Sequence, residues 1–467
     1  MTKTTEHIIL FPGYIVILRE EIIMPLLLIA AVIAFIIVFT AVYKIHPLPV
    51  LLLGAFLFGV LSRYGVLQTL DLISGGFGNT IRSIGIVIIA GTVIGVFMEK
   101  RGALKIIAQK IIALTGEKRT PLAMSLIGFV VSICIFCDSA FIILVGLWKK
   151  IGKLAKLPLA VGAAALSMGL FASHCFIPPT PGPLAAIAVL DADFSKVLLF
   201  GTAAALAATI AGYFYVSFAG KNEVLENVEE SDPAKELPEE LFHRHWSVAF
   251  LPVLIPLMLI AAGALAKVFR SSLPEKAVTF ITIAGTPVIA LAIGAVISIF
   301  FLGQWKKDEL SVDGLMGKAV LDAANILVIT GAGGAFGEVL KKVDFTTFLP
   351  EKVSAMGVWI LLLPLGFAAL LKTAQGSSTL AILTAASITA PLLEPLGLTT
   401  PVMRALVCCA VCCGSMIVSH TNDSYFWVVT KFSGMSVRQG LKLQTLGTLV
   451  SGLAAAAVLM IMALIYG

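Results

Sequence analysis

Charged residues are scarce in this chain of 467 residues. Asp, Glu, Lys and Arg make up 13% of it, against roughly a quarter in soluble domains, whereas apolar residues make up 59%. This deficit excludes a chain that is dissolved in water over most of its length. Apolar runs of about 20 residues, enough for a helix to cross a bilayer, recur along the sequence. We therefore predict an all-α polytopic protein that spans the lipid bilayer of the plasma membrane.

Signals of several other protein classes are also missing. The N-terminus lacks the ordered basic, apolar and small-residue regions of a cleavable signal peptide, so we expect the first span to direct insertion. The seven cysteines lie in or beside apolar segments and do not form a secreted disulfide framework. The glycines between Gly331 and Gly337 lie in an apolar span, which favours close helix packing over dinucleotide binding. We predict no cofactor and no metal site.

The net charge of +6 does not indicate nucleic acid as a partner. The basic residues stand in short segments between the apolar runs, where they set the orientation of a membrane protein. A polar segment from Lys221 to His245 contains eight acidic residues together with Pro233 and Pro238, and so predicts a solvated linker. The expected divisions are an N-terminal segment of uncertain placement (1–21), a first transmembrane repeat (22–220), an acidic cytoplasmic linker (221–246) and a second, inverted transmembrane repeat (247–467).

The apolar runs form two groups of six. Predicted spans in the first group are about Pro25 to Tyr43, Pro47 to Leu61, Ser83 to Met98, Pro121 to Leu147, Leu157 to Ile177 and Val197 to Phe218. Those in the second group are about Val248 to Ala266, Val278 to Leu302, Ala323 to Val339, Val358 to Pro391, Val402 to Val429 and Leu441 to Tyr466.

The two groups correspond in order at a separation of about 240 residues. The matched pairs are Pro49-Val50 with Pro287-Val288, Ala90-Gly91 with Thr330-Gly331, and Ser173-His174 with Ser419-His420. Each match is short, and it is their common order that predicts an internal duplication.

Basic residues constrain the topology of each half. Six Lys or Arg stand between Glu99 and Thr120, and four more stand in 149–156. One straight helix over 121–148 would place these two basic segments on opposite sides of the membrane, against the positive-inside rule. A re-entrant helical hairpin with its tip at 136–139 removes the conflict, and 358–391 becomes the matching hairpin. Each half then has five crossings and one hairpin, which inverts the second half, as in many secondary transporters.

Polar residues at membrane depth are costly, so they are candidates for function. The first hairpin tip carries Asp138 and Ser139, although an Asp there could simply cap a helix. The segment from Ser173 to Pro183 contains four prolines, which break a helix and leave backbone groups free to bind an anion. An ordinary turn outside the membrane would have a similar composition.

Two more polar segments lie in the second half. The segment from Lys372 to Thr379 combines a lysine, suited to anchoring an anion, with Gly376, which lets the backbone approach a ligand. Alternatively, Lys372 could extend to the membrane interface. The segment from Ser419 to Ser424 is rich in groups that hydrogen-bond hydroxyls. The candidates for proton coupling are Asp138, His174, His420 and Asp423, for each of which a satisfied buried polar residue is the alternative.

These segments resemble the gluconate permease family, from about Pro25 to the C-terminus. The most specific pieces are Ile177 to Pro183, Thr330 to Gly337, Ala374 to Thr379 and Ser419 to Ser424. The resemblance implies proton symport of gluconate or of related sugar acids, short hydroxy acids or D-serine, by a homodimer with a moving, elevator-like transport domain. Five positions at three sites differ from the usual family pattern, which has His at Thr180, Glu-Val-Gly at 138–140 and Arg at Lys372.

The predicted function is therefore that of a carrier for a small organic anion rather than an enzyme. The residues expected to bind the substrate are Ser139, Thr180, Gly182, Lys372, Gln375, Gly376, Ser377, Ser378 and Asn422. A sodium-coupled carrier of a small carboxylate or amino acid such as D-serine is the nearest alternative, because unwound carbonyls and hydroxyls also bind sodium. A membrane-embedded hydrolase and a passive channel are alternatives of other classes.

Overall fold

A computed structural model describes residues 27–28, 30–115, 120–133, 135–154, 157–225, 246–270, 273–303, 306–342 and 357–466. The described residues form helices and connecting turns, with no strand among them. Seven of their helices are long and apolar enough to cross a membrane, and the bent pair α11–α12 makes an eighth if it is counted as one span. The prediction of an all-α polytopic fold is confirmed. The predicted segment 1–21 and most of the acidic linker lie outside the described residues.

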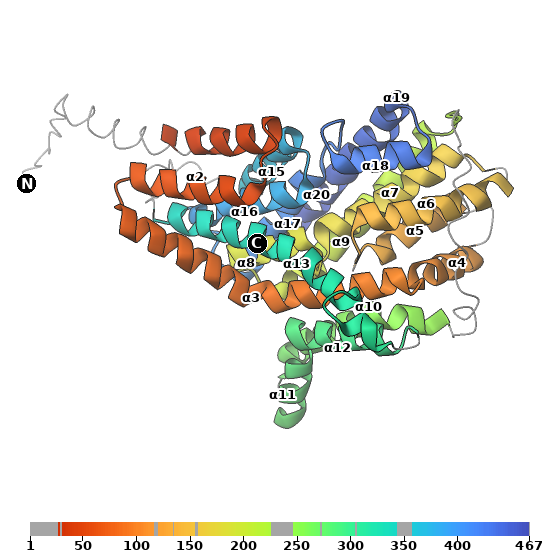
Figure 1. Cartoon of the computed structure of the whole chain (residues 1–467), viewed down its shortest axis with the longest axis horizontal. Coiled ribbons are helices and arrows are strands. Elements are labelled where there is room, and N and C mark those ends of the chain that lie inside the picture. The colour runs from red at the N-terminus through yellow and green to blue at the C-terminus, as the bar shows by residue number, and fades with distance from the viewer. Residues whose placement is uncertain are drawn as a thin grey trace, which may run out of the picture.

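Figure 1 shows how the described helices are arranged. Those of the first half are η1 (Val38–Val42), α2 (Pro47–Leu61), α3 (Val66–Lys100), α4 (Ala103–Thr115), α5 (Thr120–Val131), α6 (Cys137–Leu154), α7 (Leu159–Phe176), α8 (Pro181–Leu190) and α9 (Phe194–Ala219). Those of the second half are α10 (Trp246–Val268), α11 (Glu275–Ala284), α12 (Pro287–Phe300), η5 (Lys307–Leu310), α13 (Leu315–Leu340), η7 (Gly357–Leu361), α15 (Leu362–Gln375), α16 (Ser378–Thr389), η8 (Ala390–Leu392), α17 (Pro401–Met416), α18 (Ser424–Ser433), α19 (Val437–Gly440), η9 (Leu441–Thr445) and α20 (Leu446–Tyr466).

Helices α3 and α13 form a closely packed pair and are longer than the apolar runs predicted. The predicted span from Ser83 is too short, because α3 already begins at Val66 and its first half is more polar. A β-carbon at Gly334 of α13 would overlap the Thr80 hydroxyl of α3. The glycine-rich segment therefore serves close helix packing, as predicted.

No helix is predicted between the spans that end at Met98 and begin at Pro121, and this is wrong. The segment between them contains α4, whose residues Leu104, Ile107 and Ala108 are buried. Lys105, Gln109 and Lys110 lower the average hydropathy of this segment, although one face of the helix is apolar.

Two pairs of short helices fold back as hairpins. Helix α5 ends at Val131 and α6 begins at Cys137, one residue beyond the start of the predicted tip. In the second pair, Gly376 and Ser377 separate α15 from α16, within the predicted tip. In each pair a short break replaces one long crossing helix.

The open ends of the two hairpins lie near opposite ends of the span formed by α7 and α8. Trp148 near the end of α6 donates a 2.8 Å hydrogen bond to the Leu159 carbonyl at the start of α7. The end of α16 instead lines a cavity together with the end of α8. Because α7 and α8 continue in one direction over Leu159–Leu190, the two open ends are separated by the length of that span.

Each hairpin packs on a helix that is itself interrupted. Residues 177–180, which include Pro178 and Pro179, separate α7 from α8, and residues 417–423 separate α17 from α18. The backbone of each hairpin lies close to the backbone of its interrupted helix. A β-carbon at Gly169 of α7 would overlap the Ser125 carbonyl of α5, and one at Gly414 of α17 would overlap the Leu365 carbonyl of α15. The two hairpins and the two interrupted helices thus form one packed unit, which we call the core unit (α5–α8 and α15–α18).

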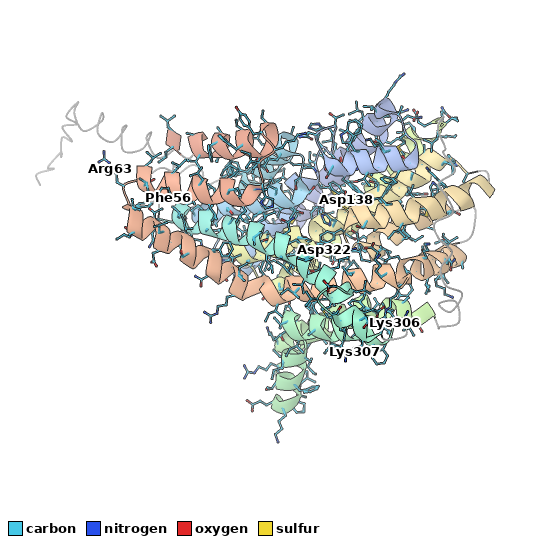
Figure 2. The ribbon with its side chains drawn as sticks, in the orientation of Figure 1. Phe56, Arg63, Asp138, Lys306, Lys307 and Asp322 are labelled. Atoms are coloured by element: carbon cyan, nitrogen blue, oxygen red, sulfur yellow. The ribbon has the colours of Figure 1, made fainter. Side chains whose placement is uncertain are left out.

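Figure 2 labels charged side chains at several places along the molecule. Arg63 lies at one end, Lys306 and Lys307 lie toward the other, and Asp138 lies between them. The partly buried Asp138 side chain therefore lies away from Arg63 and from Lys306 and Lys307.

Candidate functional site

An ion pair joins the second hairpin to the second interrupted helix. The Lys372 ammonium near the end of α15 donates a 2.5 Å hydrogen bond to the Asp423 carboxylate at the start of α18. These side chains are 0% and 3% exposed. Lys372 Nζ also lies 5.3 Å from the centre of the Phe171 ring on α7. Since a charge buried this deeply requires a partner, the pair explains why Lys372 stays inside rather than extending to the membrane interface.

Asp423 is held on both carboxylate oxygens. The Ser419 hydroxyl donates a 2.5 Å hydrogen bond to Oδ2, the oxygen that also binds Lys372. The Tyr425 backbone N–H donates to Oδ1 at 3.1 Å, so that Asp423 caps α18. Ser419 is itself anchored, because its backbone N–H donates to the Thr448 hydroxyl at 3.0 Å. The carboxylate is therefore fixed in place at the helix break.

Buried polar atoms on elements that neighbour this pair lack a hydrogen-bond partner. Among the described residues they include His174 Nδ1, Ser378 Oγ and both amide atoms of Gln375. They come from α7, the start of α16 and the second hairpin tip. His174 lies close enough to Lys372 and Asp423 to interact with both electrostatically. An unmatched buried polar group costs about 1–3 kcal/mol, so these groups are suited to a polar ligand that satisfies them.

The first hairpin contributes a second carboxylate. Asp138 and Ser139 lie in the first turn of α6, and both side chains are partly buried. The Asp138 carboxylate interacts electrostatically with Asp423 and with Lys372. Both hairpins and both interrupted helices therefore supply ionisable or polar groups within electrostatic range of one another.

The proline-rich break lies beside a small cavity. Thr180 and His174 line it together with Gly91, and its volume is about 20 Å³, room for about one water molecule. The Thr180 hydroxyl donates a 2.6 Å hydrogen bond to the Ile177 carbonyl. A β-carbon at Gly182 would lie 2.6 Å from Ile382 Cδ1, so Gly182 allows α8 to approach α16.

The remaining predicted residues connect the second hairpin tip to the second break. Gly376 has a φ of +72° and ends α15. A β-carbon there would overlap the Asn422 carbonyl oxygen. The Asn422 side chain donates a 2.5 Å hydrogen bond to the Thr373 carbonyl, and His420 Nε2 lies 3.3 Å from the same oxygen. Ser377 caps α16. These residues hold the tip against the break.

Sequence reasoning missed a polar chain that extends the site. Tyr425 stacks on Phe171 with ring centres 5.1 Å apart. Its hydroxyl lies 3.2 Å from the Ser167 hydroxyl, which donates a 2.7 Å hydrogen bond to the Gln444 side chain. Ser167 and Gln444 are polar residues in apolar spans, so the rule that identified the other candidates would have identified them too.

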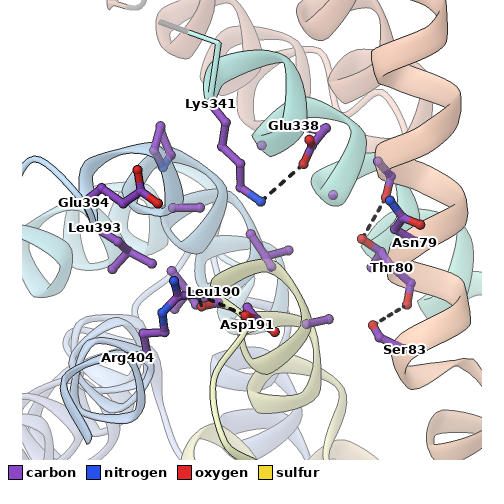
Figure 3. A pocket seen from close by; sticks show the side chains of 17 residues that line it. Asn79, Thr80, Ser83, Leu190, Asp191, Glu338, Lys341, Leu393, Glu394 and Arg404 are labelled. Atoms are coloured by element: carbon purple, nitrogen blue, oxygen red, sulfur yellow. Dashed lines mark hydrogen bonds and ion pairs between the residues drawn. The ribbon is translucent and has the colours of Figure 1, made fainter. Parts of the chain in front are cut away.

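A larger cavity lies between the α3–α13 pair and the core unit (Figure 3). Its volume is about 590 Å³, within the usual range for ligand pockets. Arg404 donates hydrogen bonds to the Asp191 carboxylate at 3.2 Å and to the Leu190 carbonyl at 3.1 Å. Lys341 pairs with Glu338 at 3.2 Å. The other polar side chains of the lining are Asn79, Thr80, Ser83 and Glu394.

Comparisons with known proteins place this chain in a family of transporters. The model of the GntP family permeases matches residues 24–465. An uncharacterized permease of Haemophilus influenzae is 33% identical over 434 residues, which cover 88% of this chain and 87% of the relative. A gluconate permease of Pseudomonas aeruginosa is 29% identical over 413 residues, which cover 86% and 89%. The prediction of a transporter rather than an enzyme is confirmed.

The fold also has a solved counterpart. The YdaH transporter of Alcanivorax borkumensis, described as having an unusual topology, superposes with a TM-score of 0.61. The match covers 85% of this chain and 88% of that one at 17% sequence identity, so it bears on the fold alone. Together with the family match over nearly the whole length, the apolar helices make this a multi-pass protein of the plasma membrane. The chain belongs to the GntP family of permeases.

Proposed function

We propose that this protein carries gluconate or a related small hydroxy or sugar acid into the cell together with a proton. The observation that carries the proposal is the buried Lys372–Asp423 pair, together with the buried polar atoms on neighbouring elements that lack hydrogen-bond partners. An ammonium is suited to a carboxylate, and amide, hydroxyl and imidazole groups are suited to several hydroxyls. The protonatable candidates are Asp138, His174, His420 and Asp423.

The order of the helices supports a duplicated, inverted architecture. The Ser173-His174 pair stands just before the break that leads to α8, and Ser419-His420 stands in the break that leads to α18. A hairpin precedes each interrupted helix, and the hairpins open toward opposite ends. Repeats of opposite orientation allow one site to face each side of the membrane in turn.

The proposed movement is that of the core unit against the α3–α13 pair, in the manner of an elevator. Both cavities lie at the boundary between them. Helices that stay packed against each other usually leave few cavities, so the cavities support movement along this boundary. The larger cavity opens at the end of α8, where the second hairpin also opens. We assign it to the outer access route, and the substrate would then pass along the boundary toward His174 and Thr180.

The test is uptake of labelled gluconate by purified protein in proteoliposomes. We expect an inward proton gradient to drive accumulation and the replacement of sodium by choline to leave it unchanged. Uptake that requires sodium would instead favour the sodium-coupled alternative. Folded protein that transports no gluconate under either gradient would reject this substrate, and competition by short hydroxy acids and D-serine would then be measured.

A further inference from the structure

The ion pair permits a more specific statement about coupling, which rests on the proposed function. We propose that Asp423 carries the coupled proton, and that the substrate carboxylate replaces it as the partner of Lys372. The proton binds to Oδ2 of Asp423 from the outer solution and is released to the inner one. Protonated Asp423 keeps its place on Ser419 while the ammonium of Lys372 turns to the incoming carboxylate.

The contacts distinguish Asp423 from the other protonatable groups. Asp423 alone among the four candidates has a described hydrogen bond to Lys372, at 2.5 Å. Asp138 interacts with Lys372 only through space, as does His174. His420 points to a backbone carbonyl on the partly exposed side of the hairpin tip. The substrate carboxylate can therefore compete with Asp423 for the Lys372 ammonium, and it cannot compete in this way with the other three candidates.

The groups that face Asp423 come from every neighbouring element. Lys372 approaches from α15, Ser419 from the break and the Tyr425 N–H from α18. Asp138 and Cys137 of α6 and His174 and Cys175 of α7 lie within electrostatic range. Lys372 is the one cation in this described set, so its loss to a substrate would leave an ionised Asp423 beside Asp138. Proton uptake by Asp423 removes that repulsion, which links binding of the anion to binding of the proton.

The charge balance of the site suits this exchange to a carrier. In the empty site the ammonium and the Asp423 carboxylate sum to zero. In the loaded site the ammonium and a monovalent substrate carboxylate sum to zero, and protonated Asp423 adds nothing. The core unit therefore carries the same charge across the membrane in both directions, and neither movement exposes an unpaired buried ion.

The experiment compares net uptake with exchange in an Asp423→Asn variant. Without substrate this variant leaves the Lys372 ammonium unpaired, whereas with substrate the ammonium is paired. We expect proton-driven net uptake to fall by at least about a hundredfold, because the empty core unit cannot return. Exchange of external labelled gluconate for internal unlabelled gluconate does not need the empty return, so we expect it to stay within about threefold of wild type and to lose its dependence on pH.

Thermal stability gives an independent readout. Gluconate should raise the melting temperature of Asp423→Asn more than that of wild type, because the substrate restores the missing partner of Lys372. Binding to wild type should weaken by up to about tenfold per pH unit as pH rises, and binding to the variant should not. Asp322→Asn on α13 is the matched control, and it should retain both gradient-driven uptake and exchange.

Three results would overturn the inference. The first is that the Asp423→Asn variant retains gradient-driven uptake. The second is that the folded variant loses uptake and exchange to the same extent. The third is that no folded variant can be recovered, even in the presence of gluconate. A wild-type protein that shows no proton-driven gluconate uptake would instead contradict the proposed function, so the two failures are distinguishable.

Discussion

Gly376 is the residue on which the contact between the second hairpin tip and the second helix break depends. Its φ of +72° is unfavourable for other residues, and a β-carbon would overlap the Asn422 carbonyl. We expect Gly376→Ala to reduce transport at least about tenfold, since strain of about 1–3 kcal/mol adds to the overlap. Gly366→Ala on the same helix is the control, because nothing lies within 4 Å of its β-carbon position. Equal gluconate uptake by the two variants would contradict this account.

The buried pair also has a consequence for stability. Removing one member of such a pair costs about 3–5 kcal/mol, whereas removing both charges costs much less. We expect Lys372→Met to lower the melting temperature strongly, and Lys372→Met combined with Asp423→Asn to recover most of the loss while transport stays absent. Asn retains the capping of α18. Thermal unfolding in detergent measures the melting temperatures of the single and double variants. If the double variant lost as much stability as the two single variants together, the two side chains would not interact.

Individual site residues were predictable from the sequence, and their pairing was not. Lys372 and Asp423 stand out because ionisable side chains are rare in apolar segments. They are 51 residues apart, however, and meet only because α15 turns at Gly376 and packs on α17 before the second break. No periodicity in the sequence specifies that distance.

At the scale of elements, the hairpins make a prediction about accessibility. The six described cysteines are buried, so introduced ones can be labelled selectively. Leu114→Cys and Leu157→Cys flank the first hairpin, where basic residues gather, and should react with an impermeant maleimide only in inside-out vesicles. Leu362→Cys and Glu394→Cys flank the second hairpin and should react only in intact cells. If the two cysteines of either pair reacted from opposite sides of the membrane, the helices between them would cross the membrane rather than fold back.

Element lengths were harder to predict than element positions. The predicted span Pro47 to Leu61 coincides with α2, because its ends carry a proline and a polar turn. The start of α3 was misplaced by 17 residues, from Ser83 to Val66. Its polar first half lines the larger cavity through Asn79, Thr80 and Ser83, where lipid does not demand apolar residues. A run of apolar residues predicts a helix that is exposed to lipid. Hydropathy therefore misses helix segments that line a polar cavity.

At the scale of the whole molecule, movement of the core unit can be blocked by a cross-link. Gly337 lies on α13 and Ser387 on α16, and a β-carbon at Gly337 would lie 3.7 Å from that of Ser387. This distance suits a disulfide, for which roughly 3.5–4.5 Å is usual. We expect oxidised Gly337→Cys/Ser387→Cys to lose gluconate uptake and to regain it on reduction, whereas each single variant should be insensitive to oxidant. Full uptake by the cross-linked protein would exclude movement along this boundary.

The two hairpins differ in the sign of the charge that they bring to the centre. The hairpin that opens at the start of α7 carries Asp138, and the one that opens at the end of α8 carries Lys372. An anion arriving from the two sides therefore meets different electrostatics, even though it reaches the same groups. Influx and efflux should consequently saturate at different substrate concentrations, and an inhibitor that is effective from one face should be weak from the other. Thermodynamics fixes only the final accumulation ratio, and the opposite charges of the hairpins leave the two rates free to differ.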